Sequence, residues 1–295
     1  MSNFENPNRL LDVFNVLNFL DNGYELDFIL QEMKFGDFKD SDECVDFLKS
    51  EGYLIGEGGG NSPEEVSKNY TVAQLKEILR ENGLKVSGKK AELIERVMPV
   101  LPEKGDVEIT DKAKEFLKEY EWIDLYMFAL VAFDFNDYAH YVENSNEDSI
   151  QTALNFIDEC ITRALLANQF IIFIDALSAK AHVYAYIKDY ESFLDLDLQR
   201  FILGLNPISM DANTYATYQI INEANIINIR NVCEKLDLGS LRKRFNKIWN
   251  KSNIKSATVP KKTTYKILEK SLNGADIEQL NYELRYKYFD KKFAN

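Results

Sequence analysis

The chain has 295 residues, of which 45% are apolar, and a formal net charge of −13 at pH 7. This length and composition predict a soluble globular protein with a substantial core and two or three structural units. The longest apolar stretches, residues 122–133 and 170–181, are each interrupted by an aspartate and fall short of a membrane span, so they predict buried helices and no membrane contact.

The N-terminus and the cysteines indicate a location. The first residues, MSNFENPNRLL, contain no basic segment followed by an apolar one, so we expect no secretion signal. Cys44, Cys160 and Cys233 lie far apart, without the spacing of a metal knuckle or a disulfide framework. These features predict a cytoplasmic protein, with nucleoid association an option in a prokaryote and a nuclear location expected in a eukaryote.

The net charge is divided unevenly along the chain. Residues 235–295 carry fifteen Lys or Arg against six Asp or Glu, a net charge of +9, which leaves −22 for residues 1–234. Because an acidic body repels nucleic acid, any contact with a polyanion must be confined to local basic patches.

Residues 1–55 are predicted to form an N-terminal helical unit. Apolar residues recur with helical spacing over 10–20, 25–33 and 41–52. Ser41 is placed to cap the third helix and Gly52 to end it. A short strand-like segment at 53–55 follows, and then a Gly-rich linker over 56–68.

Residues 69–102 are predicted to form a compact pair of helices. Thr71 and Gln74 have the spacing of a capping box, and Gly83 can close the first helix in the left-handed conformation. Ser87 is placed to cap the second helix. The inner faces are predicted to be Leu75, Ile78 and Leu79 in the first helix and Leu93, Ile94 and Val97 in the second, with Leu84 and Val86 anchoring the turn to the core and Pro99 and Pro102 ending the second helix.

The start of the second helix is a predicted anion site. Free backbone amides and the positive end of the helix dipole lie there, and Lys89 and Lys90 add two charges. Four further cations extend this patch, while four glutamates reduce its net charge over 71–97 to +2. This charge suits a few phosphate contacts and not extensive wrapping.

Residues 71–97 resemble a SAP domain, a short helix-turn-helix module of chromatin and nucleic-acid proteins. The matching positions are Leu75, Lys76, Leu79, Gly83, Leu84, Ser87, Gly88, Lys90, Leu93 and Arg96. Gln74 departs from the family pattern, which commonly has glutamate there. The resemblance implies binding to duplex DNA, in many members AT-rich, by backbone and shape readout. The predicted DNA-binding residues are Lys76, Arg80, Lys85, Ser87, Gly88, Lys89, Lys90 and Arg96.

Other interpretations of this module remain open. Some SAP domains contact proteins or RNA, and a hairpin of this kind can also be a packing unit whose lysines are merely solvated.

Residues 103–141 are predicted to contain a strand, residues 107–109, and an amphipathic helix capped by Thr110 or Asp111. Together with the segment before the linker, this order resembles a winged-helix unit into which the SAP-like hairpin is inserted. The alternative is a plain helical packing unit.

A helical bundle is predicted over residues 142–250. Residues 178–207 are similar to one tetratricopeptide hairpin at Ala181, Tyr184 and Tyr190. Phe193 and Arg200 depart from that repeat, which has alanine at both places, and no second copy follows. The fold class is therefore mainly α, and we expect this helical, weakly tetratricopeptide-like body to bind a protein partner or form a homo-oligomer.

The basic C-terminal region is divided into a linker at 251–264 and a C-terminal helix at 265–295. Basic residues interleaved with aromatic ones suit nucleic-acid contact, so Arg242, Lys243, Arg244 and Lys247 are predicted as additional contacts. The alternative is that this region docks on the acidic body of its own chain or of a second copy.

The sequence contains little that favours catalysis. Its two histidines, His140 and His182, lie 42 positions apart among aromatic residues and alanines. The pairs Asp134 with Asp137 and Asp195 with Asp197 lack a third ligand for a metal. We therefore expect a non-enzymatic DNA-binding protein without metal or cofactor. The alternatives are a protein-interaction scaffold and a DNA-processing enzyme of an unrecognised family.

Overall fold

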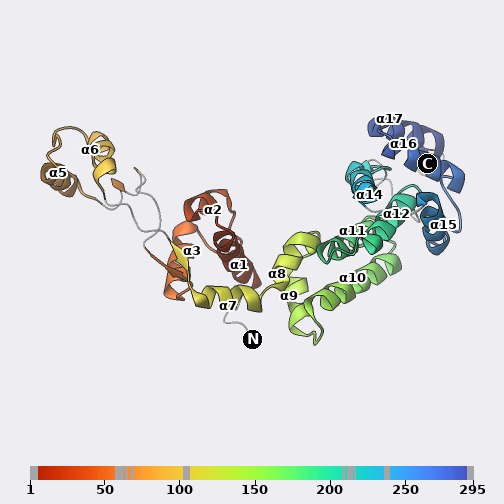
Figure 1. Ribbon diagram of the computed structural model, residues 1–295, viewed down its shortest axis with the longest axis horizontal. Coiled ribbons are helices and arrows are strands. Elements are labelled where there is room, and N and C mark those ends of the chain that lie inside the picture. Colours follow the sequence, from red (N-terminus) through yellow and green to blue (C-terminus); the bar gives the residue numbers. More distant parts are fainter. Residues whose placement is uncertain are drawn as a thin grey trace. The chain divides into compact units, whose positions relative to one another are not determined.

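The computed structural model describes residues 6–56, 63, 66–67, 70–101, 107–207, 210, 215, 217–235 and 240–290. These residues are mainly helical, with one two-stranded sheet, so the predicted fold class is confirmed (Figure 1). The chain divides into two compact units, Met1–Ile123 and Asp124–Asn295. Most of the Gly-rich linker predicted at 56–68 lies outside the described residues, whereas Val66 and Ser67 are helical.

The first unit begins with three helices and a strand, and resumes with a strand and a helix after the SAP-like hairpin. These elements are α1 (Pro7–Asp21), α2 (Leu26–Glu32), α3 (Ser41–Ser50), β1 (Leu54–Ile55), β2 (Glu108–Ile109) and α7 (Asp111–Glu119). The two strands pair antiparallel, with Leu54 opposite Ile109. The SAP-like hairpin thus lies in a long insertion between two strands that pair with each other.

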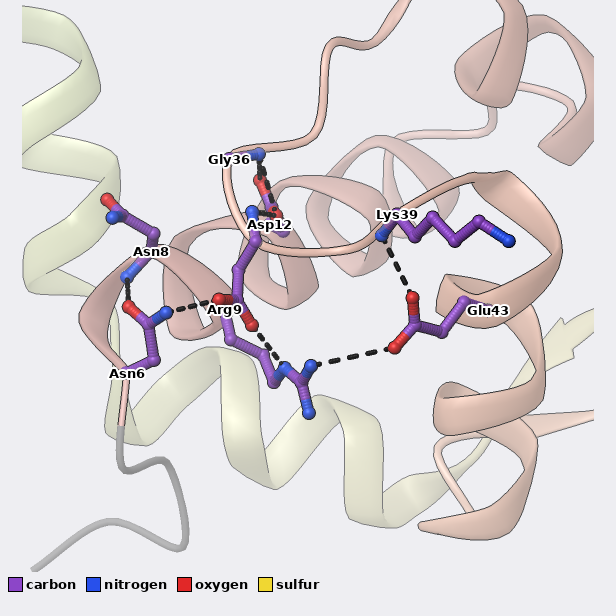
Figure 2. Close-up of polar contacts among 8 residues, drawn as sticks. Asn6, Asn8, Arg9, Asp12, Gly36, Lys39 and Glu43 are labelled. Carbon is purple, nitrogen blue, oxygen red and sulfur yellow. Dashed lines mark hydrogen bonds and ion pairs between the residues drawn. The ribbon is translucent and has the colours of Figure 1, made fainter.

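A buried carboxylate holds α1 against the segment that joins α2 to α3 (Figure 2). Asp12 is 4% exposed, and its oxygens accept hydrogen bonds from the Gly36 amide at 2.9 and 3.0 Å and from the Asp37 amide at 2.9 Å. Arg9, one turn earlier, donates to the Asp37 carboxylate at 2.6 Å and lies 4.8 Å above the Phe38 ring. Backbone amides that no helix or strand satisfies are therefore paired by one side chain.

The helix ends in this unit follow their predicted signals, with one exception. Gly52 ends α3 with a φ of +73°, as expected, and Thr110 caps α7 by accepting from the Ala113 amide at 3.2 Å. The prediction that Ser41 caps α3 is wrong. Asp40 is the N-cap and accepts from the Glu43 amide at 3.0 Å, because its carboxylate lies one residue earlier and reaches the same free amides.

The second unit is a series of packed helices that begins within the apolar stretch at 122–133. The unit boundary lies within α8 (Trp122–Leu125). The elements after α8 are the π-helical η2 (Tyr126–Leu130), α9 (Phe135–Glu143), α10 (Ser149–Leu166), α11 (Phe170–Tyr186), α12 (Tyr190–Gly204), α14 (Glu223–Lys235), α15 (Leu241–Lys251), α16 (Lys261–Leu272), α17 (Ile277–Leu284) and the π-helical η3 (Arg285–Phe289). Successive helices α10, α11 and α12 lie side by side (Figure 1).

The two long apolar stretches bury only one side. In residues 122–133, Leu130 is fully buried while Phe128 is 52% exposed, and in residues 170–181, Phe173 is buried while Ile172 is exposed. Within the described residues, no helix is long and apolar enough to cross a membrane. These stretches are amphipathic helices whose outer faces remain open.

The basic linker expected at 251–264 is shorter, since α16 begins at Lys261. Val259, two residues before α16, is fully buried, and its amide donates to the Asn206 side chain at 3.0 Å. The Thr264 hydroxyl donates to the Val259 carbonyl at 3.1 Å. Contact with Asn206, far earlier in the chain, thus fixes where α16 begins.

Replacing Asp12 with alanine should lower the free energy of unfolding of the first unit by about 3 kcal/mol, because the Gly36 and Asp37 amides lose a charged acceptor. Urea unfolding, followed by fluorescence and by hydrogen exchange in α1, measures this. Asp21→Ala, an exposed aspartate of the same helix, is the control and should change the free energy by about 0.5 kcal/mol or less. Equal effects of the two variants would contradict this role of Asp12.

Candidate nucleic-acid interface

Between β1 and β2 the chain forms two short helices joined by a turn. They are α5 (Val72–Glu81) and α6 (Lys90–Val97), and α6 continues into the 3-10 turn η1 (Met98–Val100). Leu75, Leu79, Leu93 and Val97 are fully buried between the helices, together with Val66 and Ile94, so the predicted inner faces are confirmed. Pro99 lies in η1, where α6 has ended, and Pro102 is outside the described residues.

The start and end of α5 also follow the sequence prediction. The Thr71 hydroxyl accepts from the Gln74 amide at 3.3 Å, and the Gln74 side chain accepts from the Thr71 amide at 2.8 Å, which forms the capping box. Gly83 ends the helix with a φ of +67°. The turn that follows therefore begins at a fixed place.

Two predictions for the turn at residues 84–88 are wrong. Leu84 is 37% exposed and does not anchor the turn, whereas Val86 packs partly on the core as expected. Ser87 does not cap α6. The N-cap is Lys89, and no side chain supplies a capping hydrogen bond. Ser87 lies too far back because the chain bends at Gly88 and is extended at Lys89 before the helix begins.

Arg96 holds this turn in place of a cap. Its guanidinium reaches back from α6 and donates to the carbonyl of Lys85 and, at 2.9 Å, to the carbonyl of Ser87. Glu92 lies 3.6 Å from the same guanidinium, one turn earlier in α6. Arg96 belongs to the predicted DNA-binding residues. Because its guanidinium donates to backbone carbonyls, its role is to position the turn.

The first turn of α6 has no capping side chain and contains one acidic residue, Glu92. The first amides of a helix have no intrahelical acceptor, and here the N-cap residue is a lysine, whose side chain cannot accept a hydrogen bond. Lys85 and Lys89 are exposed beside it, while Lys90 is half-buried and donates to the Ser67 carbonyl at 2.6 Å. The amides, the helix dipole and two available ammonium groups together favour a phosphate.

The remaining residues predicted for this surface lie around that turn. Ser87 and Gly88 are exposed within it, and Gly88 has a φ of +141°. Lys76 and Arg80 lie one helical turn apart on α5, with Lys76 half-buried and Arg80 exposed. The turn thus provides backbone donors and α5 provides further positive charge.

The additional contacts predicted in α15 divide into two sets. Arg244 bonds to the Asp195 carboxylate and lies 3.4 Å from that of Glu191, and Lys247 lies 3.9 Å from Asp195. Burial acts to lower the pKa of Arg244, but the hydrogen bonds to these carboxylates outweigh it and raise that pKa. Arg244 and Lys247 therefore dock on acidic residues of the same chain, which is the alternative considered for this region. By contrast, Arg242 and Lys243 are exposed.

Three of the side chains considered for catalysis make contacts within the fold. Asp134 caps α9 by accepting from the Asn136 and Asp137 amides at 2.9 and 3.1 Å. Asp197 is fully buried and accepts from Arg200 at 2.6 Å. Burial also lowers the pKa of His182, which lies beside Phe128. Within the described ranges, no three His, Cys, Asp or Glu side chains are grouped so that they could hold a metal ion.

Comparison with known proteins identifies one segment of the chain. Residues 67–99 match the family model of the SAP domain, which confirms the resemblance drawn from residues 71–97 and extends it to the helical residue Ser67. No curated protein matches the chain, and neither does any solved structure. The match suggests nucleic-acid binding for about a tenth of the chain.

Gly88→Ala should destabilise the hairpin by about 3 kcal/mol, because a Cβ at a φ of +141° would clash with the Glu92 carboxylate and lie 2.7 Å from the Arg96 guanidinium, which would displace this ion pair from the turn. The free energy of opening, measured by hydrogen exchange at the Leu79 and Leu93 amides, reports this loss.

The matched control is Gly83→Ala. Gly83 also has a positive φ, but a Cβ there would have no neighbour within 4 Å, so only the backbone penalty of about 1 kcal/mol is expected. If both alanines cost the same, Arg96 does not hold the turn as described.

Proposed function

We propose that the chain is a non-enzymatic DNA-binding protein whose SAP domain contacts the backbone of duplex DNA. The family match at residues 67–99 supports a nucleic-acid partner in general. Contact with the DNA backbone is supported by the first turn of α6. There, uncapped amides lie beside the exposed Lys85 and Lys89, in a chain of net charge −13. Lysines at a helix start oppose the helix dipole, so a bound phosphate would offset that cost.

This contact would read phosphate positions and groove shape more than base identity. The hairpin has a net charge of only +2 over residues 71–97, which allows a few phosphate contacts and weak, salt-sensitive affinity. The narrow minor groove of AT-rich duplex concentrates negative potential and is the favoured target for such a surface.

The helices and strands on either side of the SAP domain are proposed to carry it, and not to read DNA themselves. The order α1, α2, α3, β1, β2, α7 resembles a winged helix in which the SAP domain takes the place of the wing tip. In DNA-binding helix-turn-helix units the second helix of the motif enters the major groove. Here α3 and its cap contain Asp40, Asp42, Glu43 and Asp46, and residues 6–56 contain eleven acidic and four basic side chains. Such a face repels a phosphate backbone.

A protein-interaction scaffold is the second candidate, and one surface of the second unit favours it. Phe128 in η2 is 52% exposed, and its ring lies 5.4 Å from that of Tyr186 in α11. Met127 in η2 is also exposed, as are Val131 and Ile187, which directly follow η2 and α11. An apolar patch on a helical body suits a protein partner or a second copy of the chain, and this function is compatible with DNA binding by the hairpin.

The proposed location is the cytoplasm, with nucleoid association in a prokaryote and the nucleus as the location in a eukaryote. All three cysteines are unpaired, and burial raises the pKa of the Cys44 thiol to about 12, which keeps it in the unreactive protonated form. Unpaired, buried thiols suit a reducing compartment.

Lys85→Gln plus Lys89→Gln should weaken binding to an AT-rich duplex by about tenfold per lysine at 0.1 M salt, because each ammonium group neutralises one phosphate. Fluorescence anisotropy at several salt concentrations should show the slope of log K against log salt falling by about two. Both side chains are exposed, so the fold should be retained.

Lys114→Gln plus Lys118→Gln makes the same charge change on the exposed face of α7 and should alter the affinity little. If the wild-type chain does not bind at low salt, or if both double variants bind alike, the hairpin is not a DNA contact and the scaffold becomes the leading function. Metal-dependent cleavage of the duplex in the same reactions would instead indicate a DNA-processing enzyme.

A further inference from the structure

A second basic surface lies in the groove between α15 and α16, within the second unit. The groove has a volume of about 390 Å³. Its charged lining consists of Arg242 from α15 with Lys261, Lys262, Lys266 and Glu269 from α16. Four cations against one carboxylate make it a concentrated positive site in a region of the chain that is already basic.

Aromatic side chains, and not carboxylates, support these cations. The Arg242 guanidinium lies 5.3 Å from the centre of the Tyr265 ring, and the Lys261 ammonium lies 6.0 Å from that of Trp249. Lys262 and Lys266 are exposed. Among the described residues, no ion pair links any of the four groove cations to an acidic side chain, so their charge is available to a ligand.

The opposite arrangement is found on the other side of α15. There Arg244 and Lys247 are paired with Asp195 of α12, and Arg244 also with Glu191. The acidic body therefore neutralises one side of α15 and leaves the groove side positive. Neighbouring basic residues of α15 thus differ in their contacts. Arg244 and Lys247 pair with carboxylates of the same chain, whereas Arg242 lines the groove.

The first turn of α16 adds backbone donors to the groove. Its N-cap is Pro260, no side chain caps it, and no acidic residue lies in its first turn. The Pro260 carbonyl accepts from the Thr263 and Thr264 amides at 2.8 and 2.9 Å, and the amides of Lys261 and Lys262 precede these at the positive end of a 12-residue helix. Like α6, this helix begins with two lysines and no capping side chain.

We propose that the α15–α16 groove is a second phosphate-binding site, which holds the backbone of the same nucleic acid as the SAP domain. That the SAP domain binds the same nucleic acid rests on the proposed function. Helix-start amides beside ammonium and guanidinium groups match the tetrahedral oxygens of a phosphate. Two weak sites on one chain raise the overall affinity, because the second contact forms at the high effective concentration set by the first.

The groove is suited to the sugar-phosphate backbone and not to bases. Phe245, which lines it, is only 1% exposed and packs at 5.1 Å against Tyr265, so its face cannot stack on a base. Contact by charge and amides alone carries no sequence information. Binding at the groove should therefore be independent of base composition.

The test compares two double variants of matched charge on α15 and α16. Lys262→Gln plus Lys266→Gln removes two groove cations, whereas Lys251→Gln plus Lys270→Gln removes two exposed lysines of the same helices that do not line the groove. The probes are an AT-rich and a GC-rich duplex of about 21 base pairs, two helical turns. Each pair is made in the wild-type chain and in the chain with Lys85→Gln and Lys89→Gln.

The groove variant should weaken binding to both duplexes by about tenfold per lysine at 0.1 M salt and lower the salt slope by about two, in both backgrounds. The control pair should have a clearly smaller effect. If Lys85→Gln and Lys89→Gln change nothing while the groove variant still weakens binding, the proposed role of the SAP domain fails and the groove site stands.

Equal effects of the groove and control pairs would overturn the proposal. So would a groove variant that retains full DNA affinity but loses binding to polyglutamate, since the groove would then serve an acidic protein partner. A measurement on the unaltered chain guards against misfolded variants. Added duplex should protect the amides of residues 261 and 262 from hydrogen exchange, and unchanged exchange there would also contradict the site.

Discussion

A chain of net charge −13 can approach a polyanion only through cations that its own carboxylates and carbonyls do not already engage. This constraint separates basic residues that look alike in the sequence. Arg244 and Lys247 are paired with α12, Arg96 is bonded to the turn carbonyls, and Lys90 is bonded to Ser67. These contacts stabilise the fold and leave a smaller set of lysines and arginines for a ligand.

Some of the cations that remain lie at two helix starts. Several described helices begin with an Asn, Asp or Thr that accepts from the first amides, as in α1, α3, α5 and α7. By contrast, α6 and α16 begin with two lysines and no capping side chain. A lysine at this position adds positive charge where the helix dipole is already positive, and a phosphate relieves both at once. The same local chemistry thus supports a contact in each of the two units.

The sequence predicted local features well because their signals lie within a few residues. The capping box of Thr71 and Gln74, the apolar faces of α5 and α6 and the left-handed Gly83 all depend on neighbours within one or two turns. The prediction that Ser87 caps α6 is wrong because Arg96, nine residues later, holds the turn through the Ser87 carbonyl. The start of α16 was missed because Asn206, 53 residues earlier, fixes Val259, and the partners of Arg244 likewise lie about fifty residues away. Periodicity and composition carry no information about such distant pairs.

The central claim is that phosphate binds at the first turn of α6. Nuclear magnetic resonance of the full chain, titrated with AT-rich duplex at low salt, tests it most directly. The amide signals of residues 88–92 should shift with the titration and return when salt is raised, because the contact depends on released counterions. Unchanged signals over residues 85–92, while signals elsewhere shift, would contradict it.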